Sequence, residues 1–103
     1  MPRPRYVLTT KAADQFDQIL YSLAEHSGWD RSMDLEQKLY AAFSTLAANP
    51  GLGHLREDLA SRSIGFYFVD PYQILFLRDT DPVKVIAIYH SARDIRALMH
   101  QAE

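Results

Sequence analysis

Apolar residues in the first half of the chain recur at the spacing of two amphipathic helices. A step of about 100° per residue places one apolar stripe on each helix. Gly28 is expected to end the first helix, and the second runs from Trp29 to the stop at residues 49–51. So short a turn predicts an antiparallel helical hairpin. The expected core positions are Ala12, Phe16, Ile19, Leu20 and Leu23 in the first helix, and Leu35, Leu39, Ala42, Phe43 and Leu46 in the second.

The segments that flank this hairpin have the pattern of β-strands. Residues 5–9 read as a short first strand, and Thr9 and Thr10 offer an N-cap for the first helix. Three β-branched or aromatic runs follow the hairpin, separated by Asp-Pro turns, and are expected to form an antiparallel meander. These runs cover residues 63–69, 72–78 and 83–89. Ser91 can cap a last short helix over residues 92–102.

The predicted order of elements is therefore β-α-α-β-β-β-α within a single domain, residues 1–103. Segregated helices and strands indicate the α+β class. The expected architecture is an N-terminal strand, an antiparallel two-helix hairpin packed on an antiparallel sheet, and a short C-terminal helix. Trp29, at the turn of the hairpin, is expected to be a core or staple residue. Tyr72 and Phe76 are expected to pack within the sheet.

Composition removes several classes of function. The chain has no cysteine, which excludes disulfides and thiolate chemistry. Its first residues lack the apolar region of a secretory signal, and no run approaches the roughly 18 apolar residues of a membrane span. A cytoplasmic location and no membrane association are therefore expected. The net charge of −2 argues against strong direct binding of nucleic acid.

Familiar catalytic and cofactor motifs are absent from the sequence. No phosphate-binding loop, dinucleotide fingerprint, zincin motif or hydrolase elbow is present. The histidines are scattered along the chain, without the spacing of metal ligands. They stand at His26, His54, His90 and His100. No cofactor and no metal are therefore expected.

Two segments have competing interpretations. In the loop GHLREDL, Arg56 could contact a target, or it could pair locally with a neighbouring acid, and the residues alone favour local pairing. In YHSARD, Tyr89 and His90 should point to opposite faces of a strand, with Arg93 on the next turn. The alternative is that Asp94 neutralises the start of the last helix. For YHSARD, the residues alone do not favour either interpretation.

Two further groups of residues stand out. Arg62 and Arg78 lie at strand ends and, together with Arg56 and Arg93, would form an electropositive concavity in an acidic protein. Tyr21, Met33 and Tyr40 fall outside the predicted core faces of the two helices. An exposed apolar patch of that kind on a small protein usually marks an interface.

In order and spacing, several motifs resemble those of the ParE/RelE toxins of type II toxin–antitoxin systems. They are Pro50, Gly53, Arg56, Asp58 and Leu59, then Arg62, then Tyr72–Phe76, then His90 and finally Arg93-Asp94. The resemblance spans nearly the whole chain and is closest to the ParE branch. It implies inhibition of DNA gyrase and growth arrest, with neutralisation by a cognate antitoxin. The antitoxin would be ParD-like, or another small DNA-binding antitoxin, in a hetero-oligomeric complex.

With this resemblance, roles can be expected for the residues above. Target binding would use Arg56, Arg62, His90 and Arg93. The antitoxin would bind Tyr21, Met33 and Tyr40, because they fall outside the core faces of the helices. The RelE alternative is a ribosome-dependent mRNA endoribonuclease, with Arg56, Arg62, Arg78, Tyr89 and His90 as catalytic residues. A mid-chain loop without lysine and a low overall basicity favour the gyrase poison, which is not an enzyme. A third reading is a non-toxic module that only binds an antitoxin.

Overall fold

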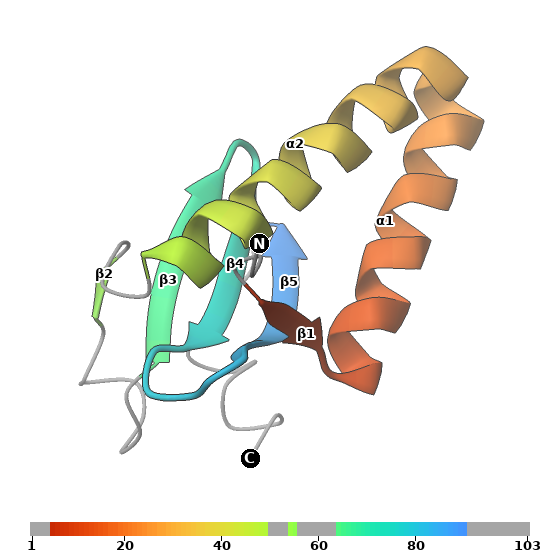
Figure 1. Cartoon of the computed structure of the whole chain (residues 1–103). Helices are drawn as coiled ribbons and strands as arrows, with labels where there is room; N and C mark the ends of the chain where they lie inside the picture. Colours follow the sequence, from red (N-terminus) through yellow and green to blue (C-terminus); the bar gives the residue numbers. More distant parts are fainter. Residues whose placement is uncertain (1–4, 50–53, 56–63, 91–103) are drawn as a thin grey trace.

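The computed structural model describes residues 5–49, 54–55 and 64–90 (Figure 1). The predicted loop residues 50–53, with Arg56, Arg62, Arg93 and the helix expected over 92–102, lie outside these ranges. The described elements are β1 (Tyr6–Leu8), α1 (Thr10–Ser27), α2 (Trp29–Ala48), β2 (His54–Leu55), β3 (Ile64–Val69), β4 (Tyr72–Leu77) and β5 (Val83–His90). The α+β class and the helical hairpin are confirmed.

The five strands form one sheet in the order β1-β5-β4-β3-β2. Strands β3 to β5 pair antiparallel, as predicted, and β2 pairs antiparallel with β3. By contrast, β1 joins β5 in parallel, with Tyr6 opposite Val83. The sheet is therefore mixed. Local sequence pattern could not reveal the direction of β1, because its partner is distant: Thr9, just after β1, bonds to Ile86, 77 residues away. The two-residue strand β2 was not predicted, since so short a segment carries no periodicity.

Local chemistry explains where the helices begin and end. The hydroxyl of Thr9 accepts from the Ala12 N–H at 3.1 Å, which caps α1 as predicted, and it donates to the Ile86 carbonyl at 3.3 Å. Gly28 ends α1 and starts α2 with φ 94° and ψ 164°. Only glycine adopts this backbone region readily, because it has no Cβ. Thr9 thus fixes the start of α1 against β5, and Gly28 forms the turn between the two helices.

Apolar residues are buried on both faces of the sheet. Between the sheet and the hairpin, the largest fully buried side chains are Phe43, Phe76, Leu39 and Leu46. The opposite face carries a second cluster, with Leu75, Ala87 and Tyr89 among its members. All five core positions predicted for α2 are buried, and Phe76 packs within the sheet as expected. Because α1 and α2 both cover one face, their outer sides are left for other contacts (Figure 1).

A bulge in β5 decides which side chains reach the hairpin. Leu75 of β4 pairs with Ala87, but the next residue pairs with Val85, so Ile86 has no partner in β4. After this bulge, Ile88 and His90 lie on the hairpin side of the sheet, while Ala87 and Tyr89 face the second cluster.

Candidate functional site

Four large apolar side chains are exposed on the helical hairpin. The exposed fractions are 68% for Tyr21, 74% for Trp29, 53% for Met33 and 45% for Tyr40. The prediction that Tyr21, Met33 and Tyr40 lie outside the core is confirmed. The prediction that Trp29 is a core or staple residue is wrong. Trp29 opens α2 at the tip of the hairpin, and this tip extends beyond the sheet, so the sheet does not cover it (Figure 1).

The spacing within α2 could have identified Trp29 as part of this surface. Trp29, Met33 and Tyr40 are separated by four and seven residues, which places them within roughly 40° of one another around the helix. Tyr40 is partly held by the core, because its ring lies 5.2 Å from that of Phe16 and 6.3 Å from that of Phe43, centroid to centroid. We call Trp29, Met33 and Tyr40 the apolar side of α2.

A small pocket lies at the tip of the hairpin. Its volume is about 210 Å³, and it is lined by Leu20, Tyr21, Trp29, Ser32, Met33 and Glu36. Ser32 is almost completely buried, and its hydroxyl donates to the Leu20 carbonyl at 2.8 Å, so it ties α2 to α1 beneath the pocket. Because both helices contribute to the lining, the pocket depends on the closed hairpin.

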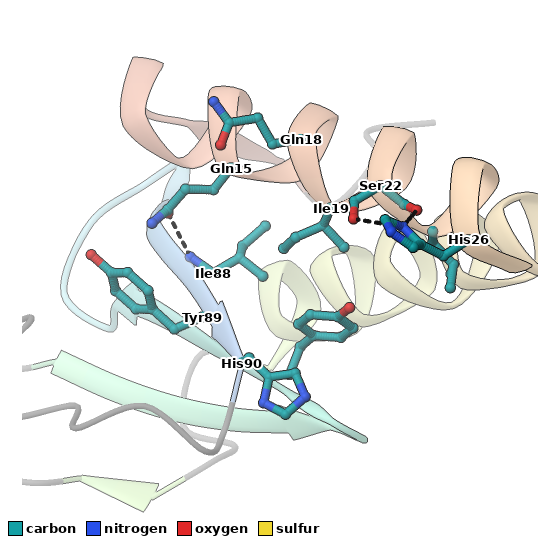
Figure 2. Close-up of a pocket in the computed structure, with 10 residues that line it drawn as sticks. Gln15, Gln18, Ile19, Ser22, His26, Ile88, Tyr89 and His90 are labelled. Carbon is teal, nitrogen blue, oxygen red and sulfur yellow. Dashed lines mark hydrogen bonds between the residues drawn. The ribbon is translucent and has the colours of Figure 1, made fainter.

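A larger groove of about 500 Å³ runs between α1 and the end of β5 (Figure 2). Here β5 continues beyond the segment that pairs with β1. The side-chain oxygen of Gln15 accepts from the Ile88 N–H at 2.9 Å. An α1 side chain therefore satisfies a backbone donor of β5. The rest of the lining is mixed: Gln18, Ile19, Ser22, Leu23, His26, Tyr72, Tyr89 and His90.

A second groove of about 490 Å³ lies on the other side of Leu23 and Tyr72. Its α2 contribution is mostly charged: Arg31, Asp34 and Lys38 line it, and the Lys38 ammonium lies 3.1 Å from the Asp34 carboxylate. We call these three residues the charged side of α2. Asp30 and Asp70 also border the groove.

The structure separates the two described residues of the YHSARD segment. His90 is exposed on the hairpin side, with its ring 5.6 Å from that of Tyr72 in an edge-to-face arrangement. Tyr89 is 95% buried, since its exposed fraction is 5%, and packs in the cluster on the opposite face. Within the described residues, its hydroxyl has no hydrogen-bond partner. The two side chains therefore leave β5 on opposite faces of the sheet, although both border the groove between α1 and β5.

The arginines of the predicted electropositive concavity are placed only in part. Arg78 directly follows β4 and is half-buried. Arg56, Arg62 and Arg93 lie outside the described residues, so the electropositive concavity stays a prediction. Over residues 5–49, 54–55 and 64–90, no cluster of three or more His, Asp or Glu could hold a metal ion. Neither α1 nor α2 is long and apolar enough to cross a membrane.

Comparisons with known proteins agree with this arrangement. A family model described as "ParE toxin of type II toxin-antitoxin system, parDE" matches residues 6–95. A solved structure titled "Chromosomal ParDE TA system from P. aeruginosa" superimposes with a TM-score of 0.70, at 16% identity, over 84% of this chain and 94% of that chain. This second likeness shows a shared fold. No curated protein matches. Because the family model spans most of the sequence, the chain belongs to the ParE toxin family of type II toxin–antitoxin systems.

Proposed function

We propose that this ParE-family toxin inhibits DNA gyrase in the cytoplasm and arrests growth, and that a cognate antitoxin neutralises it by direct binding. The antitoxin is a ParD-like or other small DNA-binding protein, and the complex is a hetero-oligomer. Family membership supports the toxin role and the existence of an antitoxin partner. No cofactor takes part, and inhibition operates through contacts with the target rather than through bond breaking.

The exposed apolar surface of the hairpin is the observation that supports antitoxin binding. Tyr21, Met33 and Tyr40 remain substantially in water although the chain is small and has a complete core between hairpin and sheet. Burial of apolar area drives association, and aromatic side chains dominate interface energetics. An amphipathic helix laid along the hairpin would cover these residues.

The test of this placement is the affinity of the purified toxin for the antitoxin encoded beside it. Tyr21→Asp and Tyr40→Asp should each weaken binding, because each puts a charge where apolar area is buried. Tyr21 is the cleaner position, since the Tyr40 ring also contacts core phenylalanines. Lys38→Asp is the matched control, because it lies on the charged side of α2. Unchanged affinity in both tyrosine variants, with melting temperatures preserved, would show that the antitoxin binds elsewhere.

For the gyrase target, we propose contacts through Arg56, Arg62, His90 and Arg93. The exposure of His90 at the end of β5 supports its part in this surface. Arginine offers planar, bidentate contacts that lysine cannot reproduce, so Arg93→Lys should reduce toxicity despite keeping the charge. An Arg56→Ala/Arg93→Ala double variant that folds and remains fully toxic would contradict this assignment.

Growth arrest on expression separates a toxin from a non-toxic antitoxin-binding module, and two assays then separate the targets. Gyrase supercoiling should be inhibited, while programmed ribosomes should show no cleaved mRNA. The burial of Tyr89 supports this ranking, because a ribonuclease would need its proton-transfer groups accessible around one phosphodiester. Cleavage that disappears in His90→Gln, with gyrase unaffected by the parent protein, would instead assign the chain to the RelE type.

A further inference from the structure

Three exposed side chains border one pocket at the tip of the hairpin. Tyr21, Trp29 and Met33 belong to neither apolar cluster in the described part of the chain, yet all three line the same pocket. Trp29 has the largest exposed fraction of them, 74%. Tryptophan and tyrosine around a small pocket are typical of the energetic centre of an interface.

The floor of this tip pocket indicates the kind of group that it accepts. Ser32 is the buried polar residue of the lining, and its hydroxyl already donates a hydrogen bond to the Leu20 carbonyl. The aromatic and thioether side chains of the lining offer apolar contact area rather than directed hydrogen bonds. A volume of about 210 Å³ accommodates one large apolar side chain, not an extended ligand. The pocket therefore suits a single apolar side chain of a protein partner.

The charges around the tip pocket are of one sign. Glu36 lines the pocket itself, and Asp17 and Glu25 stand one helical turn on either side of Tyr21, both exposed. The cations Arg31 and Lys38 line the groove on the opposite side of α2. The rim of the pocket is therefore acidic, and it is complementary to a cationic partner.

We propose that the tip pocket receives an apolar side chain from a cationic amphipathic helix of the antitoxin, with Lys or Arg residues of that helix facing Glu36, Asp17 and Glu25. This inference rests on the proposed function and specifies its partner. A second copy of this chain fits the site poorly, because two identical acidic rims would repel each other. A β-strand partner is also excluded at this position, since the pocket is built from two helices and offers no sheet edge.

Trp29 is the only tryptophan in the chain, which gives the pocket its own reporter. Toxin labelled with 5-fluorotryptophan should show one ¹⁹F resonance, which we expect to shift when the unlabelled antitoxin encoded beside the toxin is added. Acrylamide quenching of the same residue should fall, because the bound helix excludes solvent from the indole. Labelling leaves the sequence unchanged, so this measurement does not depend on a variant that folds.

Affinity measurements on full-length variants complete the test. Trp29→Ala should weaken antitoxin binding by about 30-fold or more, as expected for a central aromatic residue of an interface. Glu36→Lys should weaken binding by roughly three- to tenfold, mainly through slower association, and should reduce its dependence on salt. Arg31→Glu and Lys38→Glu are matched charge changes on the opposite side and should stay within about twofold.

The possible outcomes separate this inference from the function on which it rests. If the antitoxin binds while the ¹⁹F resonance stays fixed and Trp29→Ala has parental affinity, the pocket assignment is overturned and antitoxin binding stands. If the parent toxin does not bind the antitoxin at all, both are overturned. A resonance that moves with toxin concentration alone, together with a dimer in sedimentation, would assign the pocket to a second copy.

Discussion

The two lateral sides of α2 share one helix and one core, yet their chemistry differs. The charged side, Arg31, Asp34 and Lys38, is solvated and includes one ion pair at 3.1 Å between Lys38 and Asp34. The apolar side, Trp29, Met33 and Tyr40, leaves aromatic and thioether surface in water. A helix that packs on a core through one face needs only polar or charged residues on its remaining surface.

This difference supports the proposal that the apolar side binds a partner. Phe43, Leu39 and Leu46, on another face of the same helix, are fully buried against the sheet, whereas the apolar side is not covered by the sheet. Tyr40 connects the two surfaces, because its ring touches Phe43 beneath it and solvent above. Partner binding on the apolar side can therefore affect the packing of the core through Tyr40. Substitutions on the charged side should affect only their immediate neighbours.

The largest expected effect comes from the core beneath both sides. Phe43→Ala should lower the free energy of unfolding by about 3–5 kcal/mol, because it removes a fully buried ring that contacts Tyr6, Phe16 and Tyr40. Tyr40→Ala should cost clearly less, since almost half of that residue is already exposed. Urea denaturation of both variants gives the two values. Equal losses would mean that Tyr40 is a core residue and that the apolar side is narrower than described.

Gly28 should have an intermediate effect, because it forms the turn between the two helices that carry Tyr21 and Trp29. A Cβ at this position would meet no atom within 4 Å, so Gly28→Ala adds backbone strain without a clash. We expect a loss of about 1–3 kcal/mol in thermal or urea denaturation, from φ 94° and ψ 164° alone. Ser27→Ala, at the neighbouring exposed position, is the control. A Gly28→Ala variant as stable as its parent would show that the hairpin turn relaxes readily.

The smallest effect is expected on the charged side. Lys38→Ala should change stability by no more than about 0.5 kcal/mol, because an exposed ion pair one helical turn apart contributes little and is screened by salt. Asp34→Ala should behave alike, and the double variant should match either single one. A decrease in the free energy of unfolding above about 1 kcal/mol would indicate that the charged side also stabilises the fold.

Periodic patterns predicted the helical core because their cause is local. Leu35, Leu39, Ala42, Phe43 and Leu46 share a face through helix geometry alone, and all are buried. Trp29 failed as a prediction, because its burial depends on whether the sheet extends beneath the tip of the hairpin. The parallel pairing of β1 depended on a partner far along the chain. Spacing along α2 could have assigned Trp29 to the stripe of Met33 and Tyr40.

The candidate site was predictable to the extent that it lies on a helix. Tyr21, Met33 and Tyr40 could be identified by their angles from the core face, and each is exposed. The target residues draw on loops and strand ends, where spacing does not fix direction. Within β5, alternation correctly predicted that Tyr89 and His90 lie on opposite faces, but it could not predict that Tyr89 is buried, because burial depends on what packs against each face.

We propose that the antitoxin neutralises the toxin at the apolar side of α2, and that toxicity uses another surface. Growth of cells that express toxin and antitoxin together tests this division most directly. A Trp29→Ala/Met33→Asp toxin should arrest growth even when the antitoxin is present, because it keeps the target surface and loses the partner surface. An Arg31→Glu/Lys38→Glu toxin should be neutralised like the parent. Equal neutralisation of both variants by the antitoxin would contradict this division. So would an apolar-side variant that folds but no longer arrests growth when expressed alone.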